Sequence, residues 1–251
     1  MAFKHAYVVP IIIGVWFPLT FVLMYGIAVY NKNVSPVFPY ISDTGTWSPE
    51  SCIFDILLTT GSLFMFAIAY IRYRQVKDLC EKNEFGLSTK KLNKYSLYMG
   101  LIAAYGVIIV GCFQETNIFV VHVLGATMCF GIGTVYQFVQ VSIFVVIISF
   151  RIVIPNLVIT SEPYGNLTTA GYNPPVSGNV LYDIWIVDEF LLHPCDDITK
   201  WSKDDGGYDF HLVSTITEWI MAVTFQFFLA SFTSEFKLIQ FSEPEIKARD
   251  A

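Results

Sequence analysis

The chain has 251 residues, of which 54% are hydrophobic and only 14% charged, with a formal net charge of −6 and a mean hydropathy of +0.54. Its 15 basic and 21 acidic residues are too few to clothe a water-exposed surface of this size, which excludes a soluble globular domain and an intrinsically disordered chain. The negative net charge offers no general attraction for nucleic acid, so no nucleic-acid partner is expected. The composition predicts an all-α polytopic membrane protein, a single membrane domain over residues 1–251, with the lipid bilayer as its first partner.

Apolar windows of about 20 residues, long enough to cross a hydrocarbon core of about 30 Å, recur along the chain. The first, residues 7–30, is uncharged. It is longer than the apolar part of a signal peptide, so we interpret it as a retained transmembrane helix, with cleavage as the alternative. Further spans are expected at about residues 52–72, 95–114 and 212–234.

Residues 116–150 contain no Asp, Glu, Lys or Arg, and the apolar character continues to residue 159. As one helix, residues 119–159 would extend for about 60 Å, which is two bilayer thicknesses. We therefore expect two spans here, at about 119–141 and 143–160, with a reversal near residues 149–151. This gives six transmembrane helices. The fifth has the weakest support, because the reversal offers few polar groups to satisfy its backbone in lipid.

Basic residues set the orientation, because Lys and Arg accumulate in cytosolic loops. A cytosolic basic loop is predicted over residues 73–94, directly after the second span. Arg72 immediately precedes this loop, and the loop itself contains the cations Arg74, Lys77, Lys82, Lys90, Lys91 and Lys94. Basic residues near both chain ends place both termini in the cytosol, which requires an even number of spans. Loops 31–51 and 161–211 are then lumenal. The second is strongly acidic and carries a possible glycosylation site at Asn166.

The first lumenal loop has the prolines and the Asp-Thr-Gly of a rigid, turn-rich cap. Asp43-Thr44-Gly45 is also the tripeptide of aspartic proteases, but that chemistry needs two carboxylates sharing a proton and the chain has no second copy. We therefore interpret the tripeptide as a turn. Residues 48–50, Ser-Pro-Glu, predict the start of the second helix, with Ser48 as N-cap and Glu50 in the first turn.

Ionisable residues within spans are candidates for function. A polar cluster of Glu115, His122, His211 and Glu218 is expected near the lumenal mouth, with Asp55 close by. Such a cluster would either sense lumenal pH and line a polar cavity or cap helix ends and pair between helices. Its position near the interface favours the second interpretation by about two to one, because burial costs less there than at the bilayer centre.

The sequence shows no catalytic constellation, cofactor motif or metal-ligand spacing. Its five cysteines form no Cys-x-x-Cys pair, so no metal site is expected. A Cys52–Cys195 disulfide is allowed by compartment. We predict that the protein is not an enzyme and has no cofactor.

Several stretches resemble the damage-regulated autophagy modulator (DRAM) family of the wider DRAM/Frag/Sfk type. The most specific lies in the first loop and the start of the second helix and consists of Pro39, Tyr40, Ile41, Ser42, Asp43, Thr44, Gly45 and Glu50. Residues 91–94, 113–115, 122–126, 207–211 and 217–219 agree with it. The resemblance covers about residues 6–141 and 199–240, is most like the second paralogue, and lapses between about residues 141 and 197.

The resemblance implies a six-span, non-enzymatic protein of lysosomal or endosomal membranes that modulates autophagy, in some members linked to stress-induced cell death (apoptosis). The plasma membrane is the second expected location. The resemblance defines no catalytic residues. It also leaves the membrane or cytosolic protein partners unknown. Two alternatives remain: a polar-cavity transporter or lipid-handling protein, and a plasma-membrane scaffold for a phosphoinositide-kinase complex that binds through the basic loop.

Overall fold

A computed structural model of the chain describes residues 5–153, 199–203 and 206–239. The regular structure of this part is all helical. It consists of α1 (Val8–Tyr30), the 3₁₀ turn η1 (Asp43–Gly45), α2 (Glu50–Lys82), α3 (Leu87–Cys112), α4 (Phe119–Ala126), the π-helical segment η2 (Thr127–Ile132), α5 (Gly133–Val153) and α7 (Tyr208–Phe236). Five helical segments are long and apolar enough to cross a membrane, Phe119–Ser149 counting as one. The all-helical membrane architecture is therefore confirmed for the described residues.

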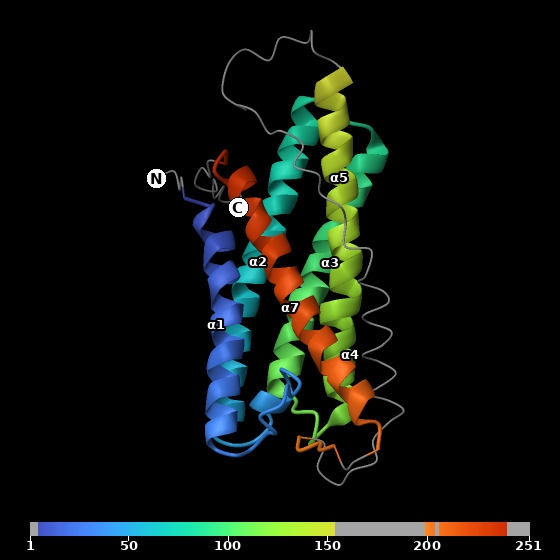
Figure 1. Cartoon of the computed structure of the whole chain (residues 1–251). Coiled ribbons are helices and arrows are strands. Elements are labelled where there is room, and N and C mark those ends of the chain that lie inside the picture. The colour runs from blue at the N-terminus through green and yellow to red at the C-terminus, as the bar shows by residue number, and fades with distance from the viewer. Residues whose placement is uncertain (1–4, 154–198, 204–205, 240–251) are drawn as a thin grey trace, which may run out of the picture.

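The helices form an elongated bundle in which α1 lies beside α2 and α7, while α3 lies between α2 and the α4–η2–α5 segment (Figure 1). Phenylalanines fill much of the shared core, among them Phe17, Phe54 and Phe228. Other large apolar side chains point outward, such as Val15, Leu19 and Val22 on α1. An apolar exterior of this kind suits contact with lipid rather than water.

The second and third helices are longer than the spans expected at residues 52–72 and 95–114. Most of the expected basic loop 73–94 is helical, and only residues 83–86 connect α2 to α3. Hydropathy marks where a helix crosses lipid, not where it ends. In the extension, Lys82 pairs with Asp78 at 2.7 Å, and Val76, Cys80, Phe85, Ile143 and Ile147 form a separate apolar cluster. Packing and i,i+4 pairs therefore continue both helices beyond the apolar windows.

One helical segment without a break runs from Phe119 to Val153. The boundary expected at residue 142, between spans 119–141 and 143–160, is not there: Ser142 lies inside α5, where its hydroxyl bonds to the carbonyl of Phe138 at 2.9 Å. Nothing in this apolar stretch supplies the polar groups that a reversal needs in lipid. Residues 154–160 lie outside the described part, so the expected fifth span, and with it a total of six crossings, stays a prediction.

Helix α3 approaches the α4–η2 segment closely at two glycines. A Cβ on Gly106 would lie 2.6 Å from the carbonyl oxygen of Gly125, so only glycine allows the backbones to touch here. Small residues are the usual means of close helix contact in membranes. The hydrogen-bonding pattern changes to the wider π type directly after this contact, at Thr127.

A buried cation joins four helices at the end of the bundle where α2 meets α3. Arg72 of α2 is 1% exposed and pairs with Glu235 of α7. Its Nε also donates to Gln140 of α5 at 2.9 Å, and Gln140 in turn donates to Ser96 of α3 at 2.6 Å. The guanidinium lies 5.2 Å from the centre of the Phe232 ring. Arg72, expected as one of the cations around a basic loop, is instead an interior residue.

Candidate functional site

The first loop folds inward over the end of the bundle opposite Arg72, and we call residues 39–46 the cap. All eight cap residues are buried. Within the cap, the backbone N–H of Tyr40 donates to Asp43 at 3.1 Å and the Thr44 hydroxyl donates to the carbonyl of Ile41 at 2.6 Å. These contacts form around the 3₁₀ turn η1, so the Asp-Thr-Gly tripeptide is a turn, as the sequence predicted.

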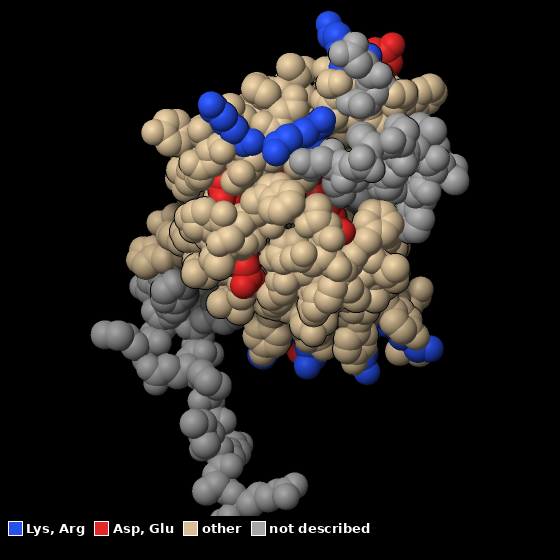
Figure 2. Space-filling model, turned by 90° about the horizontal axis from the view of Figure 1, so that it is seen from below, with Lys and Arg blue, Asp and Glu red and all other residues tan. Residues whose placement is uncertain are grey.

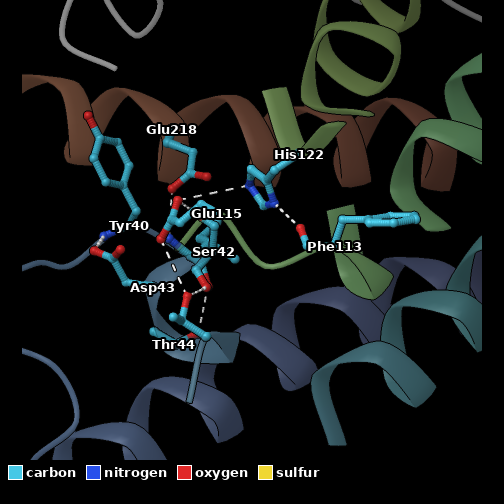
Figure 3. A network of polar contacts seen from close by, with 10 residues as sticks. Tyr40, Ser42, Asp43, Thr44, Phe113, Glu115, His122 and Glu218 are labelled. Atoms are coloured by element: carbon cyan, nitrogen blue, oxygen red, sulfur yellow. Dashed lines mark hydrogen bonds and ion pairs between the residues drawn. The ribbon is translucent and has the colours of Figure 1, made fainter. Parts of the chain in front are cut away.

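Glu115, in the connection between α3 and α4, binds the cap from the side (Figure 3). Its carboxylate accepts hydrogen bonds from the hydroxyl of Ser42 at 3.0 Å and that of Thr46 at 3.4 Å. Because Glu115 is 3% exposed, these two donors compensate for the loss of water around the carboxylate, and a histidine lies nearby.

That histidine is His122 of α4. Its Nε2 lies 3.9 Å from Glu115, and its Nδ1 lies 2.7 Å from the backbone carbonyl oxygen of Phe113. A carbonyl oxygen only accepts, so Nδ1 carries a proton. Figure 3 shows the ring lying between Glu115 and Phe113. The histidine thus ties α4 to the first half of the connection that precedes it, at Phe113 and Glu115.

Helix α7 binds the other side of the cap. Glu218 accepts the backbone N–H of Ile41 at 2.7 Å. Tyr40 donates to the hydroxyl of Ser214 at 2.7 Å, and the indole of Trp219 donates to the carbonyl of Pro39 at 3.0 Å. The acid, the hydroxyl and the indole therefore secure three successive cap residues to one helix.

The structure brings three of the four expected cluster residues, Glu115, His122 and Glu218, to the cap. His211 lies at its edge, where its ring stacks on Trp201 with centroids 4.2 Å apart and meets Tyr40 edge-on at 5.2 Å. Asp55 does not join them, since it accepts from Thr59 and Cys112 at 3.1 Å each.

Glu50 begins α2, and Pro49 occupies the N-cap position expected for Ser48. The carboxylate of Glu50 is fully buried and accepts hydrogen bonds from the side-chain amides of Asn31 at 2.8 Å and Asn33 at 2.7 Å. Glu50 therefore ties the end of α1 to the start of α2. The motif of the first loop thus contributes the cap and this helix junction.

Viewed from the cap end, the acidic side chains of the described residues show only as small patches among uncharged ones, with Lys and Arg across the upper part of the view and along its lower edge (Figure 2). In the described part, no group of three His, Cys, Asp or Glu is placed to hold a metal ion. The geometry matches the interpretation in which these groups pair between helices. The expected sites at Asn166 and Cys195 lie outside the described residues.

Replacing Gly45 with alanine is expected to destabilise the cap. The new Cβ would lie 2.2 Å from the ring of Phe54, which is 2% exposed and has little room to move. Overpacking of this kind costs about 2 kcal/mol, and thermal unfolding in detergent measures it. Gly26→Ala, where nothing lies within 4 Å of the added atom, is the matched control. Equal melting temperatures for the two variants would contradict the prediction.

The sequence did not single out several residues that build the site, including Thr46, Trp201, Ser214 and Trp219. Thr46, Ser214 and Trp219 act through residues far along the chain, such as the pair Tyr40 and Ser214, which are 174 positions apart. Trp201 acts through His211, which follows it in the next helix. The one feature of the sequence that could have identified those on helices is that a polar side chain stands alone on an otherwise apolar helix face. Residues 207–211 and 217–219 resemble the family, but the resemblance assigns them no role.

Comparison with known proteins matches residues 5–239 to a family model described as the Frag1/DRAM/Sfk1/Cwh43P N-terminal domain. A DNA damage-regulated autophagy modulator protein 2 from Bos taurus is 32% identical over 251 aligned residues, covering 92% of this chain and 84% of that protein. A DNA damage-regulated autophagy modulator protein 1 from Mus musculus is 33% identical over 92% of this chain and 91% of that protein. The matches extend through residues 141–197, where the resemblance lapsed. No solved structure matches.

Proposed function

Since the chain belongs to the Frag1/DRAM/Sfk1/Cwh43P family, we propose that it is a non-enzymatic, multi-pass protein of lysosomal or endosomal membranes that modulates autophagy. The observation that carries the proposal is its 32% identity, over 92% of the chain, to a relative named as an autophagy modulator. A Xenopus tropicalis relative named modulator of macroautophagy TMEM150B is 37% identical over 52% of the chain. The surroundings of the cap support the non-enzymatic part, because Glu115, His122 and Glu218 are engaged in contacts that hold the helices and the cap together.

Gene deletion and rescue test this proposal. In cells that lack the gene, autophagic flux should fall and should return when the full chain is restored. A tagged copy should colocalise with a lysosomal marker. The tagged variant Arg74→Leu, altered at an exposed position, serves as a control for surface changes. A tagged protein that stays away from lysosomes, together with unchanged flux after deletion, would contradict the proposal.

We infer six crossings from the ends of the described helices. The last turns of α5 pack beside the α2–α3 connection, since Ile147 contacts the cluster that contains Cys80 and Phe85. Thr199 lies at the opposite end, where it accepts the backbone N–H of Ser35 at 3.2 Å. The described residues on either side of the gap, at 153 and 199, therefore lie at opposite ends of the bundle. The start of α1 and the end of α7 then share one side (Figure 1). Exposed cations around residues 83–86 favour the cytosol for that side.

Glycosylation tests this topology. The six-span arrangement puts Asn166 in the lumen, so Asn166→Gln should remove a glycan and increase electrophoretic mobility, whereas enzymatic deglycosylation should leave the variant unchanged. A tag placed after residue 251 should be digested by protease added to sealed vesicles. If the wild-type chain carries no glycan and the tag resists digestion, the proposed orientation is wrong.

A second candidate function is supported by the helical extension of α2 and α3. Six of the seven cations expected around the basic loop are exposed there, and only Arg72 is buried. This cationic extension would suit an anionic membrane surface or an acidic cytosolic partner, as a plasma-membrane scaffold requires. Reversing the charges of Lys90, Lys91 and Lys94 to glutamate should then abolish partner recruitment. Recruitment that survives the reversal would remove this candidate.

A further inference from the structure

A small cavity lies inside the bundle beneath the cap, among α1, α2, α3, η2 and α7, with Ile41 and Ser42 of the cap in its wall. Its volume is about 60 Å³, far below the roughly 300–1,000 Å³ of sites that hold drug-sized molecules. One water molecule takes up roughly 15–30 Å³. The cavity therefore has room for about two to four waters, and it excludes a lipid or an organic cofactor.

Gln226 of α7 gives this cavity a polar group that the rest of the bundle does not use. The side chain lines the cavity and is 8% exposed. Its amide oxygen Oε1 makes no hydrogen bond to any residue that the structure describes. Buried polar atoms in native proteins are nearly always paired, either with protein or with ordered water. The Gln226 amide therefore calls for a partner that the cavity can hold.

Glu218, two helical turns before Gln226 on α7, lines the same cavity nearer to the cap. Its carboxylate is 5% exposed and accepts the backbone N–H of Ile41. A carboxylate has about four acceptor positions, and no Lys, Arg or His is among the described residues that line the cavity. The cavity thus has an acceptor at each of two depths, about 12 Å apart along the helix axis.

The remainder of the wall is mainly apolar, and phenylalanines such as Phe17, Phe54 and Phe225 dominate it. Cavities lined only by groups of this kind stay dry, whereas polar partners retain buried water. The π-helical segment η2 contributes Cys129 and Phe130 to the wall, and π turns are found frequently at functional sites. Whether the cavity is wet or dry is therefore decided by Gln226 and Glu218.

We propose that the cavity binds a short file of water molecules that runs from the Gln226 amide to the Glu218 carboxylate. Each water donates to the acceptor beside it and accepts from the next water, so both buried groups gain hydrogen bonds. A separation of about 12 Å needs about three waters at a spacing of about 2.8 Å, which agrees with the volume. The file hydrates Glu218 from inside the bundle. The inference does not depend on the autophagy proposal, since it rests on the cavity and its acceptors alone.

X-ray hydroxyl-radical footprinting of the purified full chain in nanodiscs tests the inference, because radicals formed from bound water oxidise the side chains next to it. Met65 lines the cavity and should be oxidised at least fivefold faster than Met24, which is fully buried outside the lining. Oxidation of Met65 at the rate of Met24 would show that the cavity is dry and would overturn the proposal.

Two substitutions in the cavity give an independent test. Gln226→Leu removes the acceptor farther from the cap, so oxidation of Met65 should fall to the rate of Met24. Since Oε1 bonds to no described residue, this variant should melt no lower than wild type. Ala222→Leu, which fills the cavity, should suppress oxidation of Met65 in the same way.

Gln137→Leu is the matched control, because it replaces a buried glutamine of α5 outside the lining. Oxidation of Met65 should then stay at the wild-type rate. Wild-type oxidation of Met65 in both Gln226→Leu and Ala222→Leu would overturn the proposal, since the radicals would then come from water elsewhere.

Discussion

Replacing Arg72 with leucine is expected to lower the free energy of unfolding by about 3 kcal/mol, the low end of the range for breaking a buried ion pair. The low end applies because Glu235 retains 27% exposure and stays partly hydrated after its partner is lost. The substitution also leaves the side-chain oxygens of Gln75 and Gln140 without their donor. For a chain of this length the loss corresponds to a fall in Tm of roughly 6 to 12 °C.

Arg74 provides the matched control, since it lies two residues along the same helix and its contacts are with exposed Tyr70. Arg74→Leu should change stability by less than about 0.5 kcal/mol. Adding Glu235→Gln to Arg72→Leu should cost less than the same change in the wild-type background, because the carboxylate no longer has a buried partner to lose. Equal melting temperatures for Arg72→Leu and Arg74→Leu would show that the ion pair does not hold the four helices.

Replacing Glu115 with alanine is the second large expected effect, again about 3 kcal/mol. The change leaves the hydroxyls of Ser42 and Thr46 and the Nε2 of His122 facing a void in a buried site. Glu115→Gln should cost about 1 kcal/mol, since its amide oxygen still accepts one hydroxyl. Thermal unfolding measures the total cost, and hydrogen exchange at residues 39–46 locates it.

Glu81 is a suitable control because it is an exposed acid, paired at 3.8 Å with exposed Lys77. Glu81→Ala should change stability by less than about 0.5 kcal/mol and leave exchange in the cap unaltered. If the backbone amides of the cap exchange as slowly in Glu115→Ala as in wild type, then Glu115 does not hold the cap in place.

Local sequence features predicted where the helices lie, but not which side chains contact one another across the bundle. A span is expected at residues 7–30, and α1 covers Val8–Tyr30. The agreement is close because a long uncharged window can be recognised from the sequence alone, without knowing what the helix packs against. Arg72 was misjudged for the opposite reason. A positive charge at the end of an apolar window is typical of a loop, and its burial depends on Glu235, which is 163 residues away.

The cap shows the same limit at the site. The sequence identified Glu115, His122 and Glu218 as a group because ionisable residues are rare in spans. It could not reveal that Glu218 binds the N–H of Ile41, since a backbone donor leaves no mark in composition.

The cap also sets an order of events during synthesis. Ile41 is made early, yet its carboxylate partner follows 177 residues later. At about 5–20 residues per second, the ribosome needs roughly 10 to 35 s to supply that partner. Throughout that interval the first loop has no docking surface on α7. The cap therefore acquires its full set of contacts only after α7 has been made, and a chain truncated before residue 214 would hold its first loop through Glu115 alone.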